Sequence, residues 1–559
     1  MIEKLIKIRK LLVENGLDAW LQPVHDEWFG EYPPACNRRV EWISGFSGSA
    51  GLTIIGREKA VLLTDGRYTL QARAETPAQF EVQNSGDVSA QKWLSDNFPN
   101  GARVGYDPKL YTRAMLDKFT CHPARGTRGS GLILIPNENL IDKLWNDRPP
   151  APTTKVFEHE LKYAGESAES KKKRIAEIIK KSGADAAFIS APESVCWLLN
   201  IRARDTENTP LHLARAIIDI NGEVSMDTSL RWYDKYKNKK MLFDPQNTSV
   251  FITDLLEKAG VILQSGEDPC TLPKAIKNEV EIAGIRKAHI HDGAAVTKLL
   301  YWLSQQENVS ELDVVDKILE FRKSQENFLE PSFDTIAGSG ANGAIVHYRA
   351  TPETNRILQT NELFLLDSGG QYFDGTTDIT RTIFINNGAI GSPSAEHKKM
   401  FTLVLKGHIA LATAKFPEGT KGSQLDALAR QYLWQAGADY DHGTGHGVGC
   451  LLGVHEGPQR VSKRGGDAAL AAGMVLSNEP GYYKAGEYGI RIENLVTVVP
   501  AGEKFLKFKT LTCAPIDENL VDFLLLTEAE KTWLSDYHKW VAETLKPLLK
   551  EQEYSWLIG

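Results

Sequence analysis

The sequence has few cysteines and no long apolar run. Six cysteines occur among 559 residues, no two of them forming a C-x-x-C pair: Cys36, Cys121, Cys196, Cys270, Cys450 and Cys513. This scarcity argues against a zinc ribbon or a disulfide framework and is typical of a reducing compartment. No apolar stretch approaches the ~20 residues of a membrane-spanning helix, and the opening MIEKLIKIRKLLVENG lacks the apolar core of a signal peptide. The sequence therefore predicts a cytoplasmic protein without membrane attachment.

An excess of positive charge is also absent. The formal net charge is −7, from 65 Lys and Arg against 72 Asp and Glu, which gives no electrostatic basis for binding nucleic acid. Apolar residues make up 42% and charged residues 25%, values that are ordinary for a globular protein. Because 559 residues are too many for one core, we expect two to four domains.

Two stretches in the first half of the chain share one pattern. Residues 2–14 place apolar side chains at helical spacing, Gly16 ends the helix, and LDAWLQP follows as a strand. Residues 168–194 repeat this order of helix, terminating glycine (Gly183) and strand. The repetition predicts two related α/β units.

The similarity continues downstream of each stretch. RRVEWISGFSGSAG parallels ESVCWLLNIRARD, and Trp42 corresponds to Trp197. Three prolines in NDRPPAPTTK, residues 146–155, indicate a linker between the two copies. We therefore predict two tandem related α/β domains, at residues 1–150 and 151–274.

The rest of the chain, residues 275–559, has a different pattern. It begins helical, is rich in strands at 362–385, is helical again at 395–436, and is rich in strands and glycine turns at 440–500. Helices alternating with antiparallel hairpins predict an α+β domain. The apolar and aromatic tail that ends in EYSWLIG receives no role from its pattern alone.

Two aspartates flank a glycine-rich turn in this block. Asp367 ends the apolar run LFLL, and Asp378 opens the next β-rich run. A turn at Asp374-Gly375 would place both side chains on one face of a hairpin. Strict pairing would leave them four positions apart, roughly 13 Å on a flat strand. A bulge or a strong twist would have to bring them together.

Two glutamates and three histidines follow. Glu479 ends an apolar run in VLSNEPGYY, and YGIRIENLVTVV places Glu493 inside an apolar strand. His442, His446 and His455 lie between the two aspartates and the two glutamates, in DHGTGHGVGCLLGVHEGP. A carboxylate in an apolar strand is costly unless it is paired or bound to metal.

Four such acids cannot all be ionised in one place without cations. Four carboxylates and one imidazole suit a pair of divalent ions, and hard oxygen ligands with a single nitrogen favour manganese, cobalt or zinc. Two ions about 3.5–4 Å apart can share a bridging hydroxide and hold a carbonyl under attack, which is the chemistry of hydrolysis.

Each residue taken alone also has an ordinary structural interpretation. Asp367 and Asp378 could be turn or cap residues, Glu493 could face outward from its strand, and His446 could be a loop residue. GTGHGVG does not match a phosphate-binding G-x-G-x-x-G loop. The order and spacing of the residues together favour the metal site.

Several motifs carry a resemblance to a known family: LLDSGGQYFDGTTDITRT, HGTGHGVG, VHEGP, NEPGYY and GIRIEN. They resemble the metallopeptidases of the pita-bread fold, which include methionine aminopeptidases, prolidases, creatinases and Xaa-Pro aminopeptidases. RRVEWISGFSGSAG, LLTDGRYTLQA, GANGAIVHYRATPETNR and VLKGHIA make the chain most similar to the three-domain, cytosolic-type Xaa-Pro aminopeptidases, over nearly its whole length. The resemblance implies creatinase-like N-terminal domains I and II, a pita-bread catalytic domain with a C-terminal tail, and a homodimer.

The resemblance also implies five ligands for two divalent ions, usually manganese: Asp367, Asp378, His446, Glu479 and Glu493. Asp378 and Glu493 would bridge the ions. Glu479 would also take the proton of the bridging water as general base.

Five other residues receive roles in the same way. His347 would assist proton movement or steady the tetrahedral intermediate, His455 would contact the region of the scissile carbonyl, and His442 would line the proline side. Arg491 would support the carboxylates or the substrate, and Arg67 in TDGRY would reach the peptide. Alternatives stay open: His347 as a packed strand residue, Arg67 as a surface turn residue, and Arg491 as an ion-pair partner in a strand.

The implied activity is removal of the N-terminal residue from short peptides whose second residue is proline. An X–Pro amide has no N–H and the ring fixes φ, so the site must accept a rigid ring and, following the family, the trans isomer. A prolidase acting on X-Pro dipeptides and a pita-bread binding module without metal are the alternatives. The duplicated N-terminal domain disfavours the first, and the complete ligand set disfavours the second.

Overall fold

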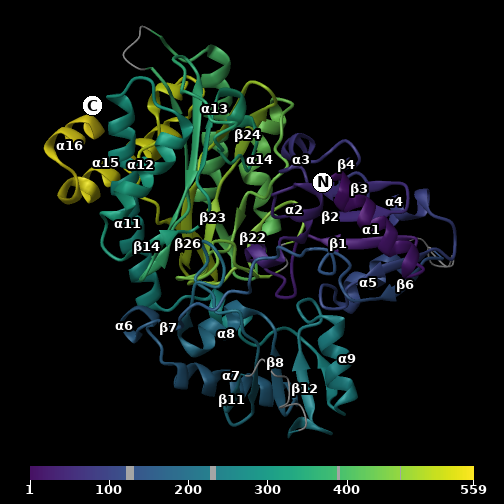
Figure 1. Cartoon of the computed structure of the whole chain (residues 1–559). Helices are drawn as coiled ribbons and strands as arrows, with labels where there is room; N and C mark the ends of the chain where they lie inside the picture. The colour runs from purple at the N-terminus through teal and green to yellow at the C-terminus, as the bar shows by residue number, and fades with distance from the viewer. Residues whose placement is uncertain (121–130, 227–234, 387–390, 466–467) are drawn as a thin grey trace. The chain divides into compact units, whose positions relative to one another are not determined.

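The computed structural model describes residues 1–120, 131–226, 235–386, 391–465 and 468–559 (Figure 1). Cys121 therefore lies outside the described residues. The chain separates into two compact units. The first comprises Met1–Glu158, Ser167–Glu207 and Leu211–Cys270, and the second comprises His159–Glu166, Asn208–Pro210 and Thr271–Gly559. The two N-terminal domains fall within the first unit except for residues 159–166, 208–210 and 271–274, and the predicted boundaries at residues 150 and 274 stay predictions.

The first unit begins with a mixed six-stranded sheet in the order β4-β3-β2-β1-β5-β6. Its strands are β1 (Ala19–Pro23), β2 (Leu52–Gly56), β3 (Ala60–Thr64), β4 (Glu81–Asn84), β5 (Arg103–Tyr106) and β6 (Ile133–Pro136). Strand β2 pairs antiparallel with β1 and β3, whereas β1 with β5, β5 with β6, and β3 with β4 are parallel pairs. Its helices are α1 (Ile2–Glu14), α2 (Arg39–Ser44), α3 (Thr69–Glu75), α4 (Ala90–Asn97) and α5 (Arg113–Thr120).

A second, five-stranded sheet has the order β11-β10-β8-β12-β13. Its strands are β8 (Ala186–Ile189), β10 (Ala216–Asp219), β11 (Val224–Ser225), β12 (Lys240–Phe243) and β13 (Ile262–Ser265). The accompanying helices are α7 (Ala168–Ser182), α8 (Pro192–Leu199) and α9 (Val250–Lys258), and β7 (Phe157–Glu158) pairs with β9 (Ile201–Arg202). Pairs β8–β10 and β10–β11 are antiparallel, and pairs β8–β12 and β12–β13 are parallel.

This sequence of strand directions is the same as that of β3-β2-β1-β5-β6 in the first sheet. Helix α7 precedes β8 as α1 precedes β1, and both helices are followed by a glycine with positive φ, Gly16 at 63° and Gly183 at 77°. Trp42 in α2 and Trp197 in α8 lie in corresponding helices. The prediction of two related α/β domains in tandem is confirmed.

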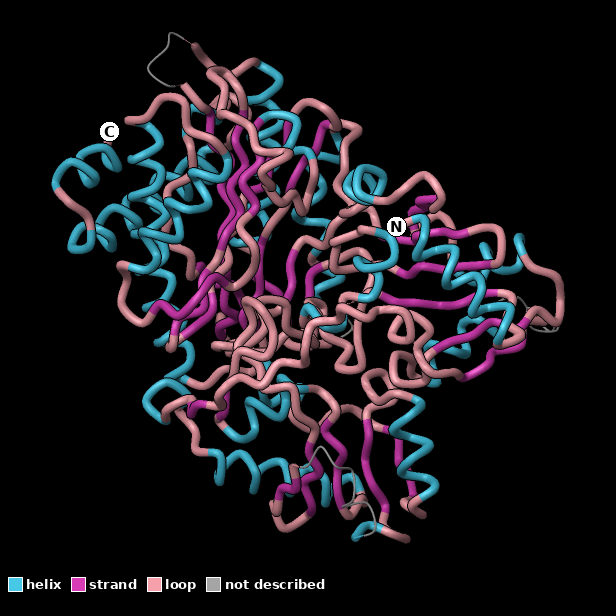
Figure 2. Tube along the Cα trace, in the orientation of Figure 1, coloured by secondary structure: helices cyan, strands magenta, loops and turns pink. Residues whose placement is uncertain are grey.

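The second unit combines strands with long helices (Figure 2). Its strand pairs are antiparallel, as predicted. Its main sheets have the orders β14-β17-β18, β15-β16-β19 and β20-β27-β26-β23, and β21–β22 and β24–β25 form separate pairs. The strands are β14 (Phe328–Pro331), β15 (Ile336–Ser339), β16 (Leu363–Ser368), β17 (Gly370–Tyr372), β18 (Gly375–Thr376), β19 (Ile379–Phe384), β20 (Lys415–Pro417), β21 (Gly445–His446), β22 (Arg460–Val461), β23 (Val475–Asn478), β24 (Gly481–Lys484), β25 (Tyr488–Arg491), β26 (Asn494–Pro500) and β27 (Phe505–Thr510). The helices are α6 (Leu161–Ala164), α10 (Thr271–Ala275), α11 (Glu279–Ser304), α12 (Glu311–Lys323), α13 (Ala395–Ala412), α14 (Asp426–Gln435), α15 (Glu528–Leu545) and α16 (Glu551–Ile558).

The hairpin of the two aspartates turns one residue earlier than predicted. Tyr372 in β17 pairs with Gly375 in β18, so the two turn residues are Phe373 and Asp374 and not Asp374 and Gly375. Gly375 is required for another reason: a Cβ added there would lie 2.8 Å from the Cα of Ile285 in α11. The glycine therefore allows the helix to approach the hairpin closely.

The earlier turn brings the aspartates nearer in register. Asp367 pairs directly with Thr380, and Asp378 is two positions from Thr380 on the same face of its strand. The offset is therefore two positions, roughly 7 Å along a strand, and no bulge is required between them.

Helix α11 also packs closely against the C-terminal part of the unit. A Cβ added at Gly293 would lie 1.8 Å from the carbonyl oxygen of Cys513. On the same helix, Ala295 and Leu299 share a buried cluster with Phe364 of β16. The helix thus supports the sheet that carries Asp367.

Gly293→Ala should lower the free energy of unfolding by at least about 1–3 kcal/mol, because the new methyl group must displace backbone. Thermal unfolding of the full chain measures the effect. Gly30→Ala is the matched control, since no atom lies within 4 Å of a Cβ added there. Equal melting temperatures for the two variants would contradict the close packing of α11.

Candidate metal centre

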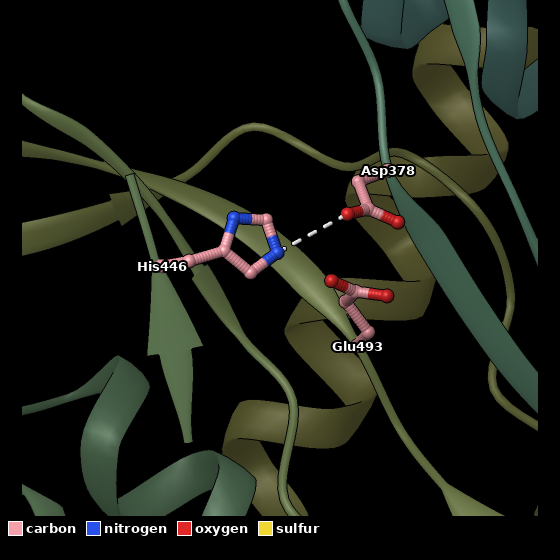
Figure 3. A group of neighbouring side chains, drawn as sticks. All are labelled: Asp378, His446 and Glu493. Atoms are coloured by element: carbon pink, nitrogen blue, oxygen red, sulfur yellow. Dashed lines mark ion pairs between the residues drawn. The ribbon is translucent and has the colours of Figure 1, made fainter. Parts of the chain in front are cut away.

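Asp378, His446 and Glu493 lie together (Figure 3). One ligand atom from each lies within 4.8 Å of the others, and His446 Nε2 is 3.3 Å from Asp378 Oδ2. His446 belongs to the short strand β21, not to a loop, and Asp378 directly precedes β19. Two carboxylates and one imidazole with this spacing are a suitable ligand group for a divalent cation.

Glu479 adds a further carboxylate to this group. It follows the last residue of β23, and its Oε1 lies 3.5 Å from His446 Nε2. Ser477 Oγ donates to the same oxygen at 3.0 Å, and the Glu479 N–H donates to the carbonyl of Thr444 at 2.8 Å. The carboxylate is therefore held beside His446 at the end of a buried strand.

Asp367 projects from β16 and contacts Arg491. Its Oδ2 accepts from Arg491 Nη2 at 2.6 Å, and both side chains are almost completely buried. Its second oxygen, Oδ1, is buried and has no hydrogen-bond partner among the described residues. A buried carboxylate oxygen that lacks a donor is a suitable ligand for a cation.

The four acids repel one another. Burial raises the pKa of Asp378 well above its usual range, the negative charges of Asp367 and Glu479 raise it further, and Arg491 opposes the shift. Burial likewise raises the pKa of Glu493, and the negative charges of Asp378, Glu479 and Asp367 raise it further. The acids cannot all be ionised here without added positive charge, so the residues present fit a pair of divalent ions.

The sequence predicts that Glu493 lies inside a strand, and this prediction is wrong. Strand β25 pairs with β24, whereas β26 pairs with β23 and β27, so the chain changes partners at Ile492 and Glu493. In this break the Glu493 N–H donates to the Thr380 carbonyl at 3.1 Å. The Thr380 hydroxyl donates to Glu493 Oε2 at 2.8 Å. Non-local pairing, not the apolar run, decides where the strand ends.

Arg381 fixes the backbone of Glu493 from the other side. Its Nη1 donates to the carbonyls of Glu493 at 2.6 Å and of Thr380 at 2.8 Å. Its Nη2 donates to the hydroxyl of Tyr537 at 3.0 Å. Because Tyr537 lies on α15, the C-terminal tail contributes to holding a candidate ligand.

A hydrogen-bonded chain joins Arg491 to His442. Arg491 Nη1 donates to the hydroxyl of Tyr483 at 2.5 Å, and that hydroxyl donates to His442 Nε2 at 2.8 Å. Burial raises the pKa of Tyr483 to about 12, so the hydroxyl keeps its proton. His442 Nδ1 lies 2.7 Å from the carbonyl oxygen of Gly443, to which it donates, and 3.9 Å from Glu479 Oε2.

Sequence reasoning did not identify Tyr483 or Thr380. Tyr483 in GYYK has the pattern of a hairpin tyrosine, and Thr380 that of an ordinary strand residue. The one signal that could have drawn attention to Tyr483 is its spacing ahead of Arg491. The two residues lie on the paired strands β24 and β25.

The remaining predicted histidines, His455 and His347, lie in irregular segments, a bend and a turn. The exposed ring of His455 meets that of His446 edge to face, with 4.2 Å between ring centroids. His347 is half-buried in a turn and is not a packed strand residue. Arg491 Nη2 donates to the carbonyl of Val346, next to His347, at 3.3 Å. The turn of His347 is thus linked to the carboxylate cluster.

Arg67 lies in the first unit and is half-buried. Its Nε and Nη2 donate to the two carboxylate oxygens of Asp65 at 3.0 and 2.8 Å, and Nη1 lies 3.8 Å from Glu31. The fork geometry holds the guanidinium in one orientation. Its contact with a peptide stays a prediction.

The chain matches four family models. Residues 283–500 match the model of metallopeptidase family M24, and residues 504–559 match that of the C-terminal region of peptidase M24. Residues 4–125 and 147–228 match two models of the creatinase/prolidase N-terminal domain.

Curated relatives match over almost the whole chain. Aminopeptidase P2 of Arabidopsis thaliana is 38% identical over 631 residues, covering 99% of this chain and 88% of the relative. A probable Xaa-Pro aminopeptidase P of Sordaria macrospora is 39% identical, covering 95% of this chain and 94% of the relative.

Solved structures match as well. The X-prolyl aminopeptidase of Caenorhabditis elegans, described as a cytosolic enzyme with a di-nuclear active site, has a TM-score of 0.93 and 33% identity and covers 100% of this chain and 98% of its own. A prolidase of Thermococcus sibiricus has a TM-score of 0.52 and 24% identity over 63% of this chain and 98% of its own. The prolidase likeness shows a shared fold alone.

The charge balance predicts opposite effects of two isosteric substitutions on the metal-free protein. Asp378→Asn should raise the free energy of unfolding on the order of 1 kcal/mol, because it removes a buried charge that faces other acids. Asp367→Asn should lower it by about 3–5 kcal/mol, because Arg491 loses its buried partner. Thermal unfolding in chelator measures both, and shifts in the same direction would contradict this distribution of charge.

Proposed function

The chain belongs to metallopeptidase family M24 and, within it, to the Xaa-Pro aminopeptidases, and we propose that it removes the N-terminal residue from peptides with proline in the second position. The observation that carries this proposal is the cluster of four acids and one histidine, in which burial and repulsion by neighbouring acids raise the pKa values of Asp378 and Glu493. Full-length relatives named as aminopeptidases of this specificity support the substrate.

The residues that would hold the metal in this proposal are Asp367, Asp378, His446, Glu479 and Glu493, and Asp378 and Glu493 would contribute to both ion sites. A divalent pair bound there supplies an activated water and polarises the scissile carbonyl. Manganese is the proposed metal, because carboxylate oxygens with one imidazole suit it, and zinc and cobalt are the alternatives.

Glu479 is the proposed general base. Its Oε1 accepts from Ser477 at 3.0 Å, which leaves Oε2, 3.9 Å from His442 Nδ1, for the proton of the attacking water. With Nε2 fixed by Tyr483, His442 keeps a constant orientation beside the base and lines the proline side.

His455 and His347 complete the proposed machinery. The exposed His455 ring next to His446 is the proposed donor to the oxyanion that develops on the substrate. His347, on a turn held by Arg491, assists proton movement or steadies the tetrahedral intermediate. Arg67, oriented by Asp65, contacts the peptide.

The proposal includes a cytoplasmic location and a homodimer. The cytosolic description of the Caenorhabditis elegans enzyme supports the location. Among the described residues no helix is long and apolar enough to cross a membrane. Neither nucleic acid nor membrane is a proposed partner; the proposed ligands are short peptides.

Hydrolysis of Arg-Pro-Pro tests the function. Purified full chain should release free arginine, lose this activity with chelator, and regain it with Mn²⁺. Arg-Ala-Pro is the matched control and should be cleaved poorly, because the site is shaped for a ring at the second position. Cleavage of Ala-Pro alone would indicate a prolidase, and failure with every peptide and metal would indicate a binding protein.

Arg67→Ala should lower kcat/KM for Arg-Pro-Pro about tenfold or more, as expected when a hydrogen bond to a charged group is lost. Arg57→Ala is a suitable control, since Arg57 is an exposed arginine of the same domain that pairs with Asp18 at 3.2 Å. An unchanged kcat/KM in Arg67→Ala would remove this residue from the proposed site.

A further inference from the structure

Asp292 on α11 is a buried carboxylate that lies outside the candidate metal centre. It pairs with Arg322 of α12, whose Nε lies 2.6 Å from Oδ1 and whose Nη2 lies 3.1 Å from Oδ2. Tyr372 and Thr377 donate their hydroxyls to Oδ1 and Oδ2, both at 2.9 Å. The side chains of this buried pair, Asp292 and Arg322, are 0% and 1% exposed, and four donors satisfy the carboxylate.

The buried pair contacts the chain neighbours of two candidate ligands. Thr377 directly precedes Asp378, and Ser368 directly follows Asp367. Arg322 Nη2 donates to Ser368 Oγ at 3.1 Å. The Thr377 hydroxyl donates to Asp292, so each member of the pair contacts one of these neighbours. Because side chains of successive residues in extended chain point to opposite faces, the pair holds the back of the hairpin whose front carries both aspartates.

Thr377 is restrained at every polar group. Its hydroxyl accepts from the N–H of Gly370 at 2.9 Å, and its own N–H donates to the Gly370 carbonyl at 2.9 Å. Its carbonyl accepts from Ser332 Oγ at 2.8 Å. Little freedom remains for the backbone that leads into Asp378.

The composition of this buried hydrogen-bonded network around Asp292 and Arg322 indicates that it fixes geometry. Burying an ion pair is costly, and apolar residues of similar volume often stabilise a fold equally well or better. A network in which every polar group has its hydrogen-bond partners holds one fixed arrangement. A metal site needs this, because its ligand distances must lie within about 0.2 Å of the required values.

We propose that Asp292 and Arg322 are positioning residues that hold Asp367 and Asp378 in the geometry that binds metal. This role rests on the proposed metal centre. Partners that orient metal ligands typically contribute about 10–100-fold to metal affinity. A purely structural role, joining α11 to α12, would change stability and leave metal affinity unaltered.

Two matched variants separate these roles. Thr377→Val and Tyr372→Phe each remove one hydroxyl donor from Asp292. Thr377 adjoins Asp378, and its hydroxyl also accepts from the Gly370 N–H, whereas Tyr372 lies beside the hairpin turn. Titration of Mn²⁺ into chelator-treated full chain, followed by calorimetry, measures affinity. Thr377→Val should weaken Mn²⁺ binding about tenfold, Tyr372→Phe less than about twofold, and Thr377→Ser should restore the affinity because it keeps the hydroxyl.

Melting temperatures of the same samples complete the test. Weaker binding in Thr377→Val, at a melting temperature similar to that of Tyr372→Phe, supports positioning. Unchanged affinity in Thr377→Val, or losses of affinity in both variants that simply follow their losses of stability, would overturn it. If the unaltered chain binds no Mn²⁺, the metal centre itself fails, and the positioning role fails with it.

Discussion

Electrostatic repulsion among buried carboxylates is the constraint on which the second unit of this protein depends. Asp378 and Glu493 are removed from water and face the charges of Asp367 and Glu479, so burial and repulsion raise both pKa values. Arg491 compensates part of this charge through Asp367. Keeping these groups together without metal lowers the stability of the fold. Bound cations compensate the negative charge and make the same arrangement stable.

The surrounding structure restrains each acid through groups that are not ligands. Thr380 and Arg381 hold Glu493 from two sides, and Tyr537 of the C-terminal helix steadies Arg381. Ser477 orients Glu479. Such partners fix the direction of each ligand before metal binds, which lowers the cost of assembling the site. The tail is therefore part of the support for the metal centre as well as part of the core.

The sequence predicts the site better than it predicts the path of the chain through it. Apolar runs that end at Asp367 and Glu479, the run that begins after Asp378, and the order of these acids point to these three residues. The turn was misplaced because Asp-Gly is a favoured hairpin turn, whereas Gly375 serves the approach of α11. The end of β25 before Glu493 depends on which strands pair, which local pattern does not encode. Asp292 and Arg322 act through partners distant in sequence, so no local spacing reveals them.

Anomalous diffraction from a crystal grown with Mn²⁺ is the direct test of the metal centre, because it locates cations without reference to activity. We expect two peaks about 3.5–4 Å apart, enclosed by the four acids and His446, with Asp378 and Glu493 between them. A single peak, or no peak among these residues at saturating Mn²⁺, would contradict this expectation and would mean that the buried acids are balanced by protons.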